Sequence, residues 1–239
     1  MIKSAQETSP TPRAGHGIAA REAEIPPIGL AGTLRIPDAA KSIVAFAHGS
    51  GSSRLSPRNL AVAEALNRHA IATLLFDLLT LQEESDRANV FDIPLLAERL
   101  VQAVQWLDRE PDVAGLPLGL FGASTGAAAA LVAAAELGDR VGAIVSRGGR
   151  PDLAGPALGR IRVPTLLIVG GDDIPVIELN QQALAQLRGP KALEIVPGAT
   201  HLFPERGALE AVIGHAARWF ERHLVSRAPG PVRVAAGNG

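Results

Sequence analysis

The sequence predicts an α/β protein whose doubly wound, mainly parallel sheet is flanked by helices. Three observations carry this prediction. Short, predominantly apolar runs such as 42–47 and 70–76 are typical of strands buried on both faces of a parallel sheet. Segments with helical spacing alternate with these runs along the chain, which is the pattern of βαβ units. Polar and glycine-rich turns follow the strands, where sheets of this kind bind their ligands.

Composition and charge narrow the class of protein. The chain has 239 residues, of which 47% are apolar and 20% charged, as expected of a globular protein with a sizeable core. Its net charge of −1 indicates neither a nucleic-acid partner nor a membrane partner. The absence of cysteine excludes a disulfide scaffold, a thiolate nucleophile and a cysteine-ligated zinc site. No apolar run is long enough for a signal peptide or a membrane span, so we expect a cytoplasmic protein; its oligomeric state stays open.

The expected domain organisation is simple. Residues 1–18 are polar with proline and glycine, and we expect a flexible N-terminal tail there. Residues 226–239 are rich in proline, glycine and alanine, and we expect a flexible C-terminal tail. No repeat or linker divides the remainder, so residues 19–225 are expected to form a single domain.

The strands are expected in a regular series. An edge-type strand ends at Pro37, because proline cannot continue a central strand. The runs 42–47 and 70–76 are largely apolar and are expected to be buried in the sheet. The expected strands are 28–36, 42–47, 70–76, the run ending at Gly122, 141–145, 163–169 and 193–196.

Helical spacing of apolar residues predicts the connecting helices. Proline at position 57 suits the first turn of a helix, where its missing N–H costs nothing. Leucine and valine recur every three or four residues between 96 and 107, and a similar stripe runs from 209 to 224. The expected helices are 57–69, 94–110, one from the turn at Ser124 to Gly138, 175–188 and one over about 209–224. The segment 77–92 is expected to be a polar loop.

The chain is organised around the turn Gly122-Ala123-Ser124-Thr125-Gly126, which joins an apolar strand to an alanine-rich helix. The turn holds the serine in a strained conformation, and glycine is needed on both sides because side chains there would collide with neighbouring elements. The Ser124 hydroxyl would then stand at a helix N-terminus, where backbone N–H groups favour a developing oxyanion. Taken alone, the same pattern also fits a turn with a surface serine.

Two partners for this serine follow later strands. Asp173 and His201 lie just past two strand ends, and the chain order Ser, Asp, His is the one expected in a fold with a nucleophile elbow. Histidine takes the serine proton and returns it to the leaving group, while the carboxylate holds the histidine tautomer. Asp172 and Asp152 are alternative acids. These interpretations compete with an ordinary loop histidine and an ordinary turn aspartate.

The loop His48-Gly49-Ser50-Gly51 follows the first buried strand. This is the place of the second oxyanion donor in a nucleophile-elbow fold, so we assign the backbone N–H groups of Ser50 and Thr125 to the oxyanion hole. A plain glycine and serine turn is the alternative. A phosphate-cradling loop is disfavoured, because no Gly-Lys-Ser/Thr follows.

Several segments together resemble the α/β-hydrolase superfamily, and within it the dienelactone-hydrolase-like branch. They are His48-Gly49-Ser50-Gly51-Ser52-Ser53, Leu75-Phe76-Asp77-Leu78-Leu79-Thr80, the turn 122–126, Ser146-Arg147-Gly148-Gly149-Arg150-Pro151-Asp152, Gly170-Gly171-Asp172-Asp173 and Gly198-Ala199-Thr200-His201-Leu202-Phe203. Dienelactone hydrolases proper use a cysteine nucleophile, whereas this chain has Ser124. Similar domains also occur fused to phosphoribosyltransferase domains.

The resemblance implies a serine hydrolase that cleaves a small carboxylic ester or lactone through an acyl-enzyme, without metal or cofactor. The alternatives are an accessory or binding domain without significant turnover, and a peptidase or thioesterase using the same three residues. The segment 146–162 is too short for a multi-helix lid, so we expect a small, open pocket. Arg147 is expected near its mouth, either binding an acidic group of the substrate or in a structural ion pair with Asp77 or Asp152.

Overall fold

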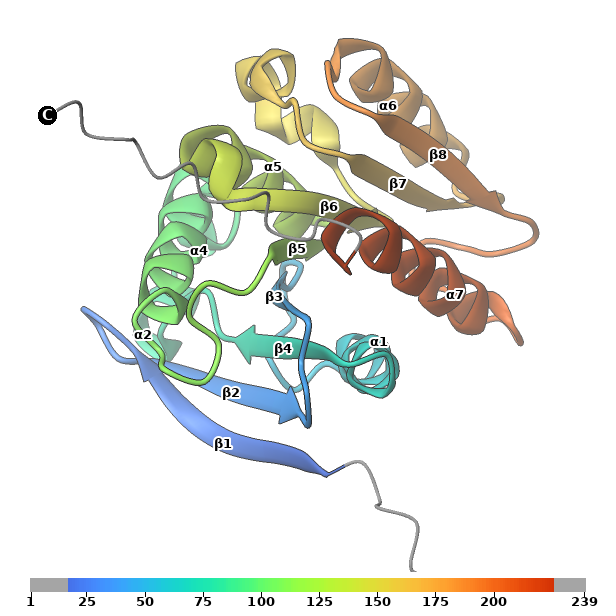
Figure 1. Ribbon diagram of the computed structural model, residues 1–239. Helices are drawn as coiled ribbons and strands as arrows, with labels where there is room; N and C mark the ends of the chain where they lie inside the picture. The colour runs from blue at the N-terminus through green and yellow to red at the C-terminus, as the bar shows by residue number, and fades with distance from the viewer. Residues whose placement is uncertain (1–16, 226–239) are drawn as a thin grey trace, which may run out of the picture.

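The computed structural model describes residues 17–225. The tails expected at 1–16 and 226–239 lie outside the described residues. The expected fold class is confirmed: an eight-stranded, mostly parallel sheet lies between two layers of helices (Figure 1). Its first strand begins at Ile18, next to the expected start of the domain. Within the described part, no helix combines the length and apolar character that crossing a membrane requires.

The sheet has the order β1-β2-β4-β3-β5-β6-β7-β8. The strands span Ile18–Ile25, Leu30–Pro37, Ser42–Ala47, Ile71–Phe76, Leu118–Ala123, Val141–Arg147, Thr165–Gly170 and Lys191–Val196 in the order β1 to β8. Strand β2 runs antiparallel to both β1 and β4, and the remaining pairs are parallel. The carboxyl ends of β3 to β8 therefore meet at one edge of the sheet.

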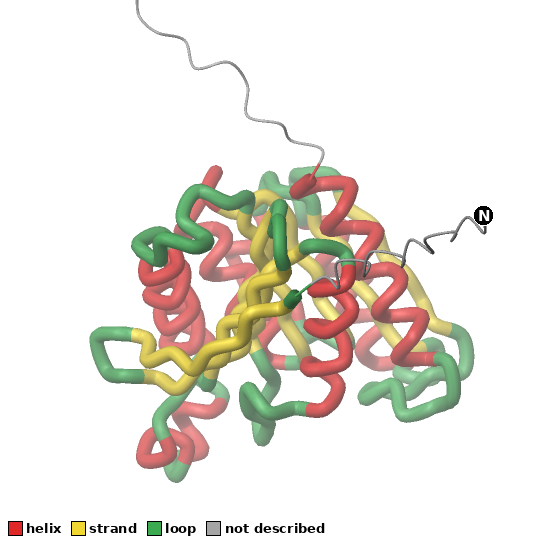
Figure 2. Tube along the Cα trace, turned by 60° about the horizontal axis from the view of Figure 1, so that its bottom comes forward, coloured by secondary structure: helices red, strands yellow, loops and turns green. Residues whose placement is uncertain are grey.

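Helices cover both faces of the twisted sheet (Figure 2). The α-helices span Pro57–Arg68, Leu81–Glu84, Arg87–Val90, Ile93–Leu107, Thr125–Leu137, Ile174–Gln186 and Ala208–Phe220 in the order α1 to α7. A 3₁₀ segment, η2, spans Pro151–Arg160, and single helical turns occupy η1 (Gly138–Arg140) and η3 (Glu221–Val225). Helices α4, α5, α6 and η2 pack on one face, whereas α1 and α7 pack on the other. Only η2 lies between β6 and β7, so this connection contains no large lid.

The structure corrects two expectations from the sequence. Strand β1 was not expected; apart from Ala23 and Ile25 its side chains are exposed, so it lacks an apolar pattern, and it is held by its hairpin with β2. The expected loop 77–92 contains the short helices α2 and α3. The local signal for α2 is a capping box, in which Thr80 and Glu83 satisfy each other's backbone N–H groups.

Candidate active site

Ser124 lies at the junction of β5 and α5 with φ 51° and ψ −122°. A side chain in this region of backbone space costs about 1–3 kcal/mol and persists only where its surroundings hold it. Two backbone hydrogen bonds to the end of β6 and the residues after it hold this conformation. The Ser124 N–H donates to the Arg147 carbonyl at 3.2 Å, and the Ser124 carbonyl accepts from the Arg150 N–H at 3.1 Å. The turn is thus fixed by the strand beside it.

The flanking glycines leave no room for a Cβ atom. A Cβ on Gly122 would collide with the backbone of Gly126 and Ala127, and one on Gly126 would collide with the carbonyl oxygens of Ala47 and His48. Helix α5 can therefore begin directly against β3 and β5. This close approach is what the spacing of the two glycines in the sequence predicts.

His201 bridges Ser124 and Asp173. Its Nδ1 lies 2.7 Å from Asp173 Oδ2, and its Nε2 lies 3.4 Å from Ser124 Oγ. With the carboxylate accepting from Nδ1–H, the Nε2 lone pair faces the serine hydroxyl and can take its proton. The Asp173 side chain is mostly buried and makes no hydrogen bond to the N-terminus of α6, so it is available to His201.

The two alternative acids lie elsewhere. Asp152 is engaged by the Arg150 guanidinium through two hydrogen bonds of 2.9 and 2.8 Å. Asp172 follows β7 and its N–H donates to the Ala199 carbonyl at 2.9 Å, but no side-chain contact joins it to His201. Of the three candidates, the structure brings only Asp173 to the histidine.

The oxyanion region differs in one detail from the expectation. Thr125 opens helix α5, where its N–H has no intrahelical acceptor, as an oxyanion donor requires. The Ser50 N–H, in contrast, donates to Thr125 Oγ1 at 2.9 Å. It is therefore not free in this structure, and it could serve an oxyanion only if the threonine hydroxyl gave way. The hole formed by Ser50 and Thr125 stays a prediction.

His48 holds the loop that carries Ser50. Its ring is buried, its Nε2 accepts from the Leu78 N–H at 3.1 Å, and its Nδ1 lies 3.0 Å from the Gly49 carbonyl. Neutral histidine satisfies both contacts, as an acceptor at Nε2 and a donor at Nδ1. Burial lowers the pKa of His48, and the Gly49 contact opposes that shift.

The lowered pKa predicts how stability changes with pH. The unfolded chain takes up a proton on His48 near the ordinary pKa of 6.5, whereas the folded protein takes it up only at a lower pH. Stability should therefore fall as the pH drops through 6.5, and this loss should be smaller in His48→Gln, by at most about 1.4 kcal/mol per pH unit. Urea unfolding of both proteins at pH 7.5 and pH 5.5 measures the difference. Equal losses in the two proteins would contradict a neutral, buried His48.

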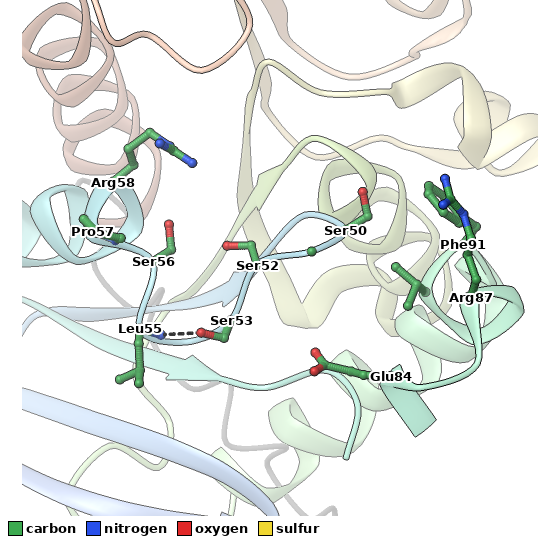
Figure 3. A pocket seen from close by; sticks show the side chains of 12 residues that line it. Ser50, Ser52, Ser53, Leu55, Ser56, Pro57, Arg58, Glu84, Arg87 and Phe91 are labelled. Atoms are coloured by element: carbon green, nitrogen blue, oxygen red, sulfur yellow. Dashed lines mark hydrogen bonds between the residues drawn. The ribbon is translucent and has the colours of Figure 1, made fainter. Parts of the chain in front are cut away.

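An open pocket of about 770 Å³ adjoins this region (Figure 3). It contacts the Ser50 loop and the start of α1, and its far wall comes from α2, α3 and Phe91. Its lining residues are Ser50, Gly51, Ser52, Ser53, Leu55, Ser56, Pro57, Arg58, Glu84, Arg87, Val90 and Phe91. Ser124, Asp173 and His201 are not among them. The pocket is linked to the serine turn through Ser50, whose N–H bonds to the Thr125 hydroxyl. Sequence reasoning missed Arg58, Arg87 and Phe91, for which no local motif exists.

Arg147 ends β6 and is 6% exposed. Neither of the expected ion pairs forms, because Asp77 binds Arg54 at 2.8 Å and Asp152 binds Arg150. Burial lowers the pKa of Arg147 to about 10, and the charge of Arg58 adds to this effect. Its Nη1 is buried without a hydrogen-bond partner. Its binding of substrate stays a prediction.

The described residues contain no group of three or more histidine, cysteine, aspartate or glutamate side chains that could hold a metal ion.

Comparison with known proteins shows which of them this chain resembles. No family model matches the chain. A crystal structure of a dienelactone hydrolase from Anabaena variabilis is 54% identical, superposes with a TM-score of 0.83, and the match covers 87% of this chain and 99% of that one. Est1E from Butyrivibrio proteoclasticus shares the fold, with 17% identity, a TM-score of 0.72 and coverage of 85% and 98%.

Curated relatives from two strains of Mycobacterium tuberculosis are 60% identical over 205 residues, and they carry the name of a proposed phosphoribosyl transferase. The match covers 86% of this chain but only 46% of those proteins, so the chain spans about half the length of the curated relatives it matches. The extensive match to the Anabaena enzyme over nearly all of its length defines the family. The chain belongs to the dienelactone-hydrolase-like α/β-hydrolases.

Proposed function

We propose that this protein is a serine hydrolase that cleaves a small carboxylic ester or lactone through an acyl-enzyme on Ser124. The observation that carries the proposal is the continuous chain of contacts from Ser124 through His201 to Asp173. The family supports hydrolysis, and a serine in place of the cysteine of dienelactone hydrolases proper favours general ester cleavage. The activity in the name of the Mycobacterium relatives belongs to a longer protein and is not assigned to this chain.

In the first half of the reaction, His201 Nε2 takes the proton of the Ser124 hydroxyl while the serine oxygen bonds to the ester carbonyl carbon. The carbonyl oxygen becomes an oxyanion that accepts from the Thr125 N–H, and from the Ser50 N–H once the Thr125 hydroxyl releases it. Asp173 stabilises the protonated His201. When the carbon–oxygen bond breaks, His201 gives its proton to the departing alkoxide and the acyl group stays on Ser124.

The second half returns the enzyme to its starting state. Water replaces the alcohol, and His201 Nε2 takes a proton from it as its oxygen bonds to the acyl carbon. The same donors stabilise the second oxyanion. The bond between the acyl carbon and Ser124 Oγ then breaks, His201 gives its proton to that serine oxygen, and the carboxylic acid is released. The 3.4 Å separation of His201 Nε2 from Ser124 Oγ supports proton exchange between these two atoms.

A panel of p-nitrophenyl esters with increasing acyl length tests the proposal. With only η2 between β6 and β7, we expect a short, open site, so kcat/KM should be highest for acetate to butyrate esters and fall for longer chains. An activity that rises steadily toward long acyl chains would contradict the open, short site. Peptide and thioester substrates belong in the same panel, because the same residues could cleave them. No turnover of any member would favour a binding domain.

A further inference from the structure

Arg147 is a buried charge without a counter-charge. Within residues 17–225 its guanidinium has no hydrogen bond or ion pair, and Nη1 is fully shielded from solvent. Buried charges in proteins are ordinarily paired, because removing an ion from water without a partner is costly. Glutamine or methionine would fill the same space without that cost. An unpaired guanidinium at this place is therefore a group that an anionic ligand would stabilise.

Arg58 faces the same region from helix α1. It belongs to the first turn of α1, its Nε is buried, and the described part of the chain offers its guanidinium neither a hydrogen bond nor an ion pair. Its charge is close enough to Arg147 to disfavour the protonated form of that residue. Figure 3 shows the Arg58 side chain extending to the same side as the hydroxyls of Ser50 and Ser56, away from Leu55. Two cations that repel each other are thus held together by the fold.

The register of the sheet places this pair beside the nucleophile. Arg147 pairs with Ala123, the residue before Ser124, and its own carbonyl accepts the Ser124 N–H. Alternation along β6 puts the Arg147 side chain on the same face as Val145, which packs in the core under α1 and α7. Arg58 belongs to α1, which covers that face, and α1 is reached directly from the Ser50 loop. A group bound by both arginines therefore lies next to the proposed site of acyl transfer.

We propose that Arg147 and Arg58 form a subsite for a phosphate monoester carried by the ester or lactone substrate. This inference rests on the proposed function for its place in catalysis, although the binding itself does not. Two unpaired guanidinium groups carry two charges, which a phosphate dianion neutralises and a single carboxylate does not. The guanidinium fork also matches phosphate oxygens through paired hydrogen bonds. The adjoining pocket adds Arg87 and one acid, Glu84, so its lining does not cancel this positive charge.

Binding of phenyl phosphate to the Ser124→Ala protein, measured by calorimetry, tests the subsite without turnover. We expect phenyl phosphate to bind more tightly than benzoate, and Arg147→Gln or Arg58→Gln to weaken its binding at least tenfold, as loss of a charge-assisted hydrogen bond implies. Arg109→Gln, which changes an exposed arginine just beyond α4, serves as the matched control and should bind like the parent. The substitution Arg147→Gln removes an unpaired buried charge. The melting temperature of the protein that carries it should therefore be no lower than that of the Ser124→Ala protein in which it is made.

Other outcomes overturn the proposal. Equal binding of benzoate and phenyl phosphate would indicate a carboxylate subsite, and unchanged binding in both arginine variants would remove the subsite altogether. If Arg147→Gln unfolds, Arg58→Gln alone decides, since its side chain is only partly buried. Hydrolysis of 4-acetoxyphenyl phosphate by the unmodified enzyme separates the hypothesis of a phosphate subsite from the hypothesis of an esterase. Binding of phenyl phosphate without hydrolysis of any ester would retain the subsite and reject the esterase.

Discussion

Replacing Ser124 with alanine is expected to lower kcat/KM for p-nitrophenyl acetate by roughly 10⁴-fold or more, because the variant has no oxygen to form the acyl-enzyme. His201 and Asp173 remain in place, since their contact does not involve the serine. The protein should keep its fold, because the backbone of residue 124 is held by Arg147 and Arg150 rather than by its own side chain. Initial rates over a range of ester concentrations measure the effect.

Two further variants separate chemistry from folding. Ser85→Ala removes an exposed hydroxyl that bonds only to the Gln82 carbonyl and should leave the rate unchanged. Ser124→Gly should be as inactive as Ser124→Ala yet more stable than it, because glycine adopts the φ of 51° without strain. Turnover by Ser124→Ala at the rate of the unmodified enzyme would show that this serine is not the nucleophile.

Replacing Gly126 with alanine is expected to destabilise the protein by about 3 kcal/mol or more, because the added Cβ would overlap the backbone of Ala47 and His48 rather than a movable side chain. Helix α5 or the end of β3 must shift to admit it. That shift would separate the Ser50 loop from Thr125, so activity should fall together with stability. Denaturant unfolding followed by circular dichroism gives the first quantity, and ester hydrolysis the second.

Gly159→Ala provides the matched control. A Cβ on Gly159 meets no atom within 4 Å, and its backbone conformation does not require glycine. The midpoint of unfolding for this variant should stay close to that of the unmodified protein. A Gly126→Ala protein that unfolds at the same midpoint as Gly159→Ala would contradict the close approach of α5 to β3 on which the nucleophile turn depends.

The parts of the fold that the sequence predicted are those with a strong local pattern. Strand β3 and helix α1 agree with the expected ranges within a residue, because an apolar run and a proline at the first helical position mark them. Strand β1 was missed because its exposed side chains follow no apolar alternation. Helices α2 and α3 have only four residues each, which is too short for a periodic signal.

The same distinction applies to the candidate site: residues with a local sequence signal could be predicted, and tertiary contacts could not. Ser124, Asp173 and His201 could be selected because each follows a strand, and the carboxyl ends of parallel strands meet at one edge. The bond from the Ser50 N–H to the Thr125 hydroxyl could not be foreseen, since it depends on the final distance between two loops. The unpaired state of Arg147 is likewise a tertiary property. It follows from Asp77 and Asp152 having other arginine partners.

Labelling with a fluorophosphonate, read by peptide mass spectrometry, tests the nucleophile most directly. The reagent bonds covalently to a serine hydroxyl that a neighbouring base activates. We expect one adduct per folded chain, on the peptide containing Ser124, with labelling slowed strongly in His201→Gln and abolished in Ser124→Ala. A folded protein that forms no adduct at Ser124, or that labels equally fast without His201, would contradict the proposed serine hydrolase.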